Sequence, residues 1–126
     1  MNKWKSKSTK SLIGADSLRR LSSSNKYKAI KTEIDGIKFD SLKEGRRYGE
    51  LKLLERAHAI KELQVHVRFS LDVNGYHICN YTPDFTYLEN GLLVVEDVKS
   101  TATKTRDYLL RKKLMMAIHG IAVREV

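Results

Sequence analysis

Two Asn-Gly dipeptides constrain the fold of this chain more than any other feature. Asn74-Gly75 and Asn90-Gly91 each separate segments suited to β-strands. Asn-Gly strongly favours a two-residue hairpin turn, because both turn positions need a positive φ. Before the first turn, apolar and polar residues alternate as in a strand with one buried face, with apolar residues at Leu63, Val65, Val67, Phe69 and Leu71. The sequence therefore predicts three consecutive antiparallel strands, over about residues 63–71, 76–87 and 92–99.

A hairpin and a helix are predicted ahead of these strands. Asp35-Gly36 lies between β-compatible residues and predicts a tight hairpin within residues 28–39. Ser41 is followed three residues later by Glu44, which together form a capping box. A helix should therefore begin there and continue to about Ala59.

The C-terminal quarter of the chain predicts a second helix and a short strand. After a loop at residues 100–104, apolar residues recur with helical spacing over residues 106–119, and Gly120 is suited to end that helix. Residues 121–126 then favour a last short strand. The order of elements predicts one α/β domain with a central mixed β-sheet flanked by helices.

The last strand of the meander carries an unusual set of charges. Residues 94–100, VVEDVKS, begin like a buried strand and then place Glu96, Asp97 and Lys99 in it. Burying unpaired charge is unfavourable. Pleating puts Asp97 and Lys99 on one face and Glu96 on the other, where Arg68 or a lysine is its expected partner.

The turn at Asn90-Gly91 predicts the neighbour of Asp97. If these two residues are central in the turn, the two residue numbers of each cross-strand pair add up to 181. Asp84 therefore faces Asp97, with Cβ atoms ~4.5–5.5 Å apart. Carboxylates this close favour a cation between them, and Mg²⁺ takes oxygen ligands of this kind. Lys99 could then orient or deprotonate an attacking water. The alternative is a salt bridge between Lys99 and the two aspartates on a solvated face.

Glu44 also allows two interpretations. It completes the capping box, a local role that needs no metal. It also shares a helix stripe with Tyr48 and Leu51, so it can point where apolar side chains point. Periodicity does not decide which stripe packs on the sheet, because a second one lies nearly opposite, at Leu42, Gly49, Leu53, Ala57 and Ile60.

Composition excludes several classes of protein. The 126 residues suffice for one domain, and no apolar run approaches the ~18–20 residues of a membrane span. The single cysteine, Cys79, excludes an internal disulfide and Cys-based zinc sites and favours a cytoplasmic setting. The histidines show no metal-ligand spacing, and we expect ordinary surface or half-buried roles for His58, His66, His77 and His119.

Most of the net charge of +9 lies in the first quarter of the chain. Residues 1–28 hold eight lysines and arginines against Asp16 alone, a net charge of +7, with many serines and few large apolar residues. We expect residues 1–26 to form a basic arm that lies along phosphates, the alternative being a solubilising tail. The residues assigned to DNA binding are Lys3, Lys5, Lys7, Lys10, Arg19 and Arg20 in this arm, and Lys104, Arg106 and Lys112 near the second helix. A solvated helix face explains the three residues near the second helix nearly as well as contact with phosphates does.

Three short motifs carry a family resemblance. S-x-x-E at a helix start, then T-P-D-F and E-D-V-K, resemble the PD-(D/E)XK nuclease superfamily in order, spacing and strand context. More narrowly, the chain is similar to short phage- and prophage-encoded endonucleases in the segments KTEIDGIKFDSLKEGRRYGELKLLE, YTPDFTYLENGLLVVEDVKS and HGIAVREV. The resemblance covers residues 27–126 and leaves the arm outside.

The resemblance implies a restriction-endonuclease-like core in which Asp84, Asp97 and Glu44 bind Mg²⁺ or Mn²⁺. Lys99 would assist the nucleophilic water. Glu96 stands outside the motif, since the acid must lie two residues before the lysine. The residues assigned to supporting the ligands or contacting DNA, but not to catalysis, are Gln64, Ser100, Thr101 and Tyr108.

The implied activity is metal-dependent hydrolysis of DNA phosphodiesters by a nuclease domain over residues 27–126, with one or two metal ions. The preferred substrate is branched DNA such as a Holliday junction, cut by a homodimer during phage recombination or replication in the cytoplasm of a bacterial host. The alternatives are a less structure-specific nickase or DNA-end nuclease and a non-cleaving DNA-binding accessory protein. No membrane contact and no organic cofactor are expected.

Overall fold

The computed structural model describes residues 31–126, so the predicted arm over residues 1–26 lies outside the described part of the chain. The described residues before Lys43 form a small hairpin of β1 (Thr32–Ile34) and β2 (Ile37–Phe39). The turn between these strands has positive φ at both central residues, 54° at Asp35 and 77° at Gly36. The predicted hairpin is confirmed.

The second compact unit of the chain, Lys43–Val126, carries the sheet. From the first helix onward, the elements are α3 (Leu42–Arg56), β3 (Lys61–Val65), β4 (Phe69–Val73), β5 (Tyr76–Tyr81), β6 (Phe85–Glu89), β7 (Leu92–Asp97), a 3-10 turn (Thr101–Thr103), α4 (Arg106–Leu114), a π-helical turn (Met115–His119) and β8 (Arg124–Glu125). Both predicted helices are confirmed, and Gly120 ends the second with a left-handed φ of 69°. None of the helices in residues 31–126 is long and apolar enough to cross a membrane.

The central sheet has the order β3-β6-β7-β8 and is mixed, since β7 and β8 are parallel and the other pairs antiparallel. The register of β6 and β7 runs from the pair Glu89 and Leu92 to the pair Phe85 and Glu96. The numbers of the facing residues therefore sum to 181, as the turn at Asn90-Gly91 predicts. Asp84 and Asp97 are the next pair of residues along these two strands.

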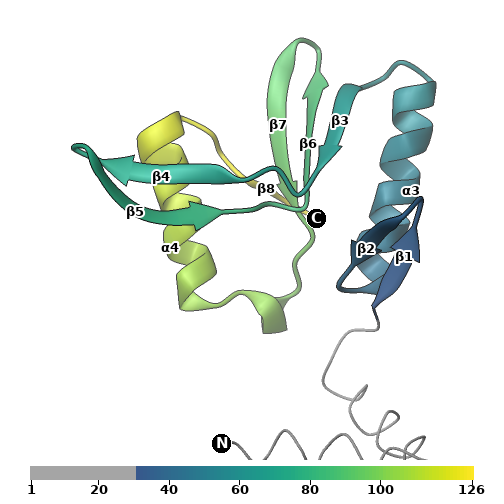
Figure 1. The fold of residues 1–126 in the computed structure, drawn as a ribbon. Helices are drawn as coiled ribbons and strands as arrows, with labels where there is room; N and C mark the ends of the chain where they lie inside the picture. The colour runs from purple at the N-terminus through teal and green to yellow at the C-terminus, as the bar shows by residue number, and fades with distance from the viewer. Residues whose placement is uncertain (1–30) are drawn as a thin grey trace, which may run out of the picture. The chain divides into compact units, whose positions relative to one another are not determined.

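The structure corrects the first two predicted strands, each of which is broken in the middle. Residues 66–68 separate β3 from β4, and residues 82–84 separate β5 from β6, so β4 and β5 form a ribbon of their own (Figure 1). Pro83 has no N–H to donate to a ladder, and His66 has a left-handed φ of 58°. One hydrogen bond joins the two breaks, from the N–H of His66 to the carbonyl oxygen of Asp84 at 3.1 Å.

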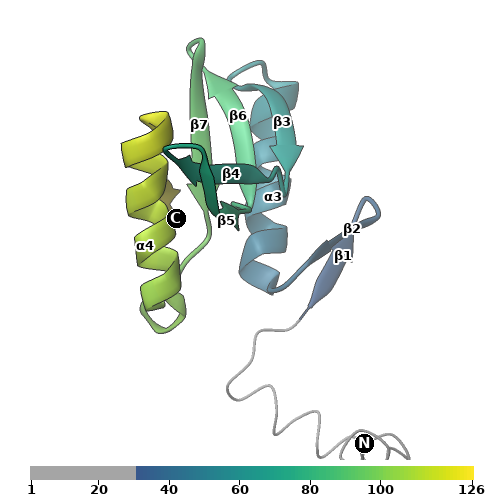
Figure 2. The same cartoon turned by 60° about the vertical axis from the view of Figure 1, so that its left-hand side comes forward.

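The two helices α3 and α4 lie on opposite sides of the sheet (Figure 2). On the α4 side, a buried apolar core joins the helix, the ribbon and the sheet, and its members are Leu71, Tyr81, Val95, Tyr108, Met115 and Val123. On the α3 side, the ring of Tyr48 stacks on Phe85 with centroids 6.4 Å apart. The stripe of α3 that contains Tyr48 and the buried Leu51 therefore faces the sheet, whereas Leu53 of the second stripe is 62% exposed.

Candidate metal centre

The bend in the long hairpin brings Asp84 and Asp97 together. Asp84 directly precedes β6, and Asp97 is the last residue of β7. The N–H of Asp84 donates to Oδ1 of Asp97 at 3.0 Å, and the N–H of Val98 donates to Oδ2 of Asp84 at 2.8 Å. Each carboxylate is thus held by the backbone next to the other, and the predicted juxtaposition of the two aspartates is present.

Tyr81, at the end of β5, supplies a further contact to Asp97. Its hydroxyl donates to Oδ2 of Asp97, and both side chains are buried. Burial, together with the hydrogen bond to Asp97, raises the pKa of Tyr81, so its hydroxyl stays protonated and remains a donor. Sequence reasoning did not identify Tyr81, because its contact with Asp97 depends on how the ribbon meets the sheet.

Glu44 and His66 complete a possible metal-binding trio with Asp84. One ligand atom of each of these three residues lies within 4.8 Å of the others. Glu44 comes from the first turn of α3 and His66 from the break between β3 and β4. Burial raises the pKa of the Asp84 carboxyl to about 8, with further contributions from the negative charges of Asp97 and Glu44. A divalent cation would relieve this crowding of negative charge, so these side chains fit the metal that the motif implies.

His66 was expected to have an ordinary role, and this expectation missed its place beside Glu44 and Asp84. The turn at Asn74-Gly75 could have indicated this position of His66. Counting outward from Asn74-Gly75 places His66 opposite Pro83, one residue from Asp84. The ribbon contains a bulge after Leu71, beyond which Phe69 pairs with Tyr81, and this one-residue shift brings His66 level with Asp84.

Lys99 follows Asp97 by two residues, and its side chain contacts an aromatic ring. Its ammonium nitrogen lies 4.4 Å from the centroid of the Tyr108 ring, a distance suited to a cation–π contact. The Tyr108 hydroxyl donates to Oε2 of Glu125 at 2.8 Å, which anchors that ring. Among the ion pairs of residues 31–126, none joins Lys99 to Asp84 or Asp97, so the alternative of a simple salt bridge is wrong.

Glu96 faces α3 and is 0% exposed. Nε and Nη2 of Arg47 donate to its two carboxylate oxygens at 2.7 and 2.8 Å, and the Tyr87 hydroxyl donates to Oε2 at 2.7 Å. The hydrogen bond to Glu96 raises the pKa of Arg47, which remains charged. The prediction that Arg68 or a lysine is the partner of Glu96 is wrong. The side of α3 that packs on the sheet presents Arg47 to this carboxylate instead.

The remaining residues assigned to the site are spread over several places. Gln64 is an exposed residue of β3, and the Ser100 N–H donates to the Thr103 hydroxyl at 2.9 Å. Thr101 opens the 3-10 turn after β7. Of the four residues assigned a supporting role, Tyr108 contacts a predicted catalytic side chain, that of Lys99.

The basic residues near α4 are partly engaged within the domain. Lys104 and Lys112 each form an ion pair with Glu125 at 3.0 Å. These lysines, Lys104 foremost, and the Tyr108 hydroxyl lower the pKa of Glu125 to about 2. Arg106 is exposed at the start of α4. The six basic residues assigned to the arm lie outside the described residues.

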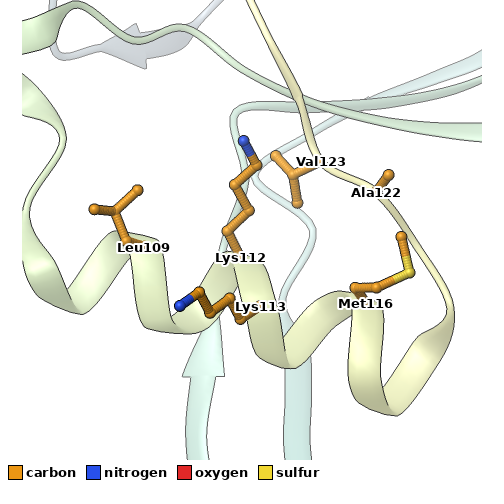
Figure 3. Close-up of a pocket in the computed structure, with 6 residues that line it drawn as sticks. All are labelled: Leu109, Lys112, Lys113, Met116, Ala122 and Val123. Atoms are coloured by element: carbon orange, nitrogen blue, oxygen red, sulfur yellow. The ribbon is translucent and has the colours of Figure 1, made fainter.

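A separate pocket of about 390 Å³ lies beside α4 (Figure 3). It is lined by Leu109, Lys112, Lys113, Met116, Ala122 and Val123. This lining is mostly aliphatic and contains no carboxylate. The pocket is therefore distinct from the acidic cluster at the bend of the hairpin.

The raised pKa of Asp84 predicts how stability depends on pH without metal. The unfolded pKa is 3.8 and the folded pKa about 8, so the native state binds more protons between these values. The free energy of unfolding should fall as pH rises through this window, by up to about 1.4 kcal/mol per pH unit from this group. With EDTA present, melting curves from pH 5 to 8 should show a smaller pH dependence for Asp84→Asn than for wild type, and saturating Mn²⁺ should stabilise the wild type at pH 8. If the melting temperatures of the two metal-free proteins changed with pH in the same way, the raised pKa of Asp84 would be contradicted.

Comparison with known proteins yields one match. Residues 24–123 match the family model described as "Protein of unknown function (DUF1064)". No curated protein and no solved structure matches the chain. A functional inference therefore depends on the motifs and the geometry of the site.

Proposed function

The chain belongs to the DUF1064 family, and we propose that it is a metal-dependent endonuclease that hydrolyses DNA phosphodiester bonds. The observation that carries the proposal is the meeting of Asp84 and Asp97, each held by the backbone beside the other, with Glu44 near Asp84. Asp84 and Asp97-x-Lys99 have the order and strand context of the PD-(D/E)XK motif. A mixed sheet with a helix on each face is compatible with a restriction-endonuclease-like core.

The donor set suits Mg²⁺ or Mn²⁺, which Asp84, Asp97 and Glu44 would hold. Carboxylate oxygens are the ligands that these ions take in proteins, usually with waters and substrate phosphate. When bound, such an ion supplies a more acidic water and offsets negative charge on the phosphate. Asp97 has a second role in the protein itself, since it accepts the N–H of Asp84 and keeps that carboxylate in place.

Lys99 provides the positive charge that the reaction needs beside the carboxylates. Its ammonium group can donate hydrogen bonds that orient the attacking water and can stabilise negative charge that develops on the phosphoryl oxygens. The Tyr108 ring limits the positions that this flexible side chain takes. Tyr108 therefore acts as a positioning residue for Lys99.

One assay tests the proposed function. Purified protein is incubated with linear duplex, single-stranded, nicked and four-way-junction DNA, each with Mg²⁺, Mn²⁺ or EDTA, and the products are mapped. We expect cleavage that EDTA abolishes, with the four-way junction as the preferred substrate, and no cleavage by a Lys99→Ala control prepared in parallel. Equal cleavage of all substrates would favour the less structure-specific nickase or end nuclease. DNA binding without cleavage under any of these conditions would favour the accessory protein.

The basic arm predicts a salt-dependent contribution to DNA binding. Deleting residues 1–26 removes seven of the eight basic residues in the first 28 positions. We expect weaker binding and a slope of log affinity against log salt that is less steep by about 0.9 for each duplex phosphate that the arm neutralises. Titrations at several salt concentrations measure this slope, and circular dichroism checks that the domain still folds. An unchanged slope would leave the arm as a solubilising tail.

Homodimerisation is expected from the second apolar stripe of α3. Leu53 in this stripe is 62% exposed and Leu42 is 41% exposed, and large apolar side chains grouped on one helix face favour association. We expect a dimer at micromolar concentration, measured by light scattering, and a shift toward the 14.5 kDa monomer in Leu53→Glu. A wild-type protein that scatters as a monomer would contradict this expectation.

A further inference from the structure

His66 lies where the long hairpin bends next to the acidic cluster. It is a non-glycine residue with φ of 58°, and its N–H donates to the carbonyl oxygen of Asp84 at 3.1 Å. A left-handed conformation is unfavourable for residues with a Cβ, so it persists where surrounding structure holds it. The hydrogen bond keeps His66 level with Asp84, and a ring nitrogen lies within 4.8 Å of ligand atoms of Glu44 and Asp84.

We infer that His66 is a nitrogen ligand of this metal centre and that it makes the centre select Mn²⁺ over Mg²⁺. The inference rests on the proposed function, because it assumes that the acidic cluster binds a divalent ion. Mg²⁺ is a hard ion that prefers oxygen ligands and keeps much of its water. Imidazole nitrogen is a softer ligand that suits first-row transition metal ions, while carboxylates suit both Mg²⁺ and Mn²⁺. A mixed set of imidazole and carboxylates therefore favours Mn²⁺.

The charges around the centre support a neutral ligand beside the carboxylates. Asp97 and Glu44 both lie next to Asp84, so three side chains that carry negative charge when ionised are already close together there. A further carboxylate would add to the repulsion among them. An imidazole adds an electron pair without adding negative charge. His66 is also an exposed residue, so a hydrated ion can reach it.

Ion binding by the full chain without DNA tests the inference. His66→Asn removes the imidazole but keeps a residue that tolerates a left-handed backbone. His58→Asn is a matched control, because His58 is also exposed and has φ of 64° but does not belong to the trio. By calorimetric titration, we expect wild type and His58→Asn to bind Mn²⁺ more tightly than Mg²⁺. His66→Asn should lose on the order of 10-fold or more in Mn²⁺ affinity and much less in Mg²⁺ affinity.

Pulsed electron paramagnetic resonance of bound Mn²⁺ gives a direct readout of a nitrogen ligand. Coupling to ¹⁴N is expected in wild type and His58→Asn and should be absent in His66→Asn. Mn²⁺ bound by wild type without ¹⁴N coupling, or equal affinities for both ions that His66→Asn leaves unchanged, would overturn the inference and leave an all-carboxylate centre for the proposed function. If neither ion binds wild type, both the inference and the proposed function fail.

Discussion

Replacing Asp97 with asparagine is expected to lower the rate of DNA cleavage by about 10²–10³-fold or more, while the protein still folds and binds DNA. Asparagine keeps one side-chain oxygen that can accept the N–H of Asp84, and the Tyr81 hydroxyl can accept a hydrogen bond from the new amide group. The variant lacks the negative charge that would help to hold the metal of the proposed function. Single-turnover cleavage at saturating Mg²⁺ or Mn²⁺ measures the effect. Thermal denaturation of the metal-free protein should show equal or greater stability, because a crowded carboxylate is gone.

The neighbouring residue provides the control for this prediction. Glu96→Gln changes the adjacent carboxylate in the same way, but Glu96 faces Arg47 and Tyr87 on the other side of the sheet. We expect Glu96→Gln to cleave at a rate close to that of wild type at temperatures where it remains folded. An inactive Glu96→Gln together with an active Asp97→Asn would show that Asp97 is not the acidic residue of the motif.

Replacing Arg47 with methionine is expected to have the largest effect on stability, about 3–5 kcal/mol. Glu96 is 0% exposed, and Arg47 supplies two of the hydrogen bonds to its carboxylate. Without Arg47, a buried negative charge has no cationic partner, which is more unfavourable than the removal of a surface ion pair. The melting temperature should fall by at least ~10 °C, measured by circular dichroism or calorimetry.

Two further variants separate an unpaired charge from a general packing defect. The double variant Arg47→Met with Glu96→Gln removes the charge while keeping an oxygen for the Tyr87 hydroxyl, so it should recover a large part of the stability of the wild type. Arg46→Met changes an exposed neighbour on the same helix and should alter stability by less than about 0.5 kcal/mol. A double variant as unstable as Arg47→Met alone would mean that the buried charge is not the cause.

Local chemistry in the sequence determined the turns, the helices and one strand register. Asp35-Gly36 and Asn90-Gly91 adopt positive φ in tight turns, because glycine and asparagine tolerate this conformation better than other residues. The turn at Asn90-Gly91 sets the pairing of β6 with β7, and this pairing is sufficient to predict that Asp84 meets Asp97. These features depend on neighbouring residues in the chain, so they can be predicted without knowledge of the tertiary structure.

Only the tertiary structure decided which faces of these elements meet and where the long hairpin bends. Two stripes of α3 have comparable periodicity, and packing on the sheet selects the one with Tyr48, which also directs Arg47 to Glu96. The bulge after Leu71 changes the pairing by one residue and brings His66 level with Asp84. Periodicity states only which residues share a face, and a one-residue shift in a strand changes every cross-strand neighbour. Contacts between distant segments, and with them the place of His66 beside Glu44 and Asp84, therefore depend on how the whole domain packs.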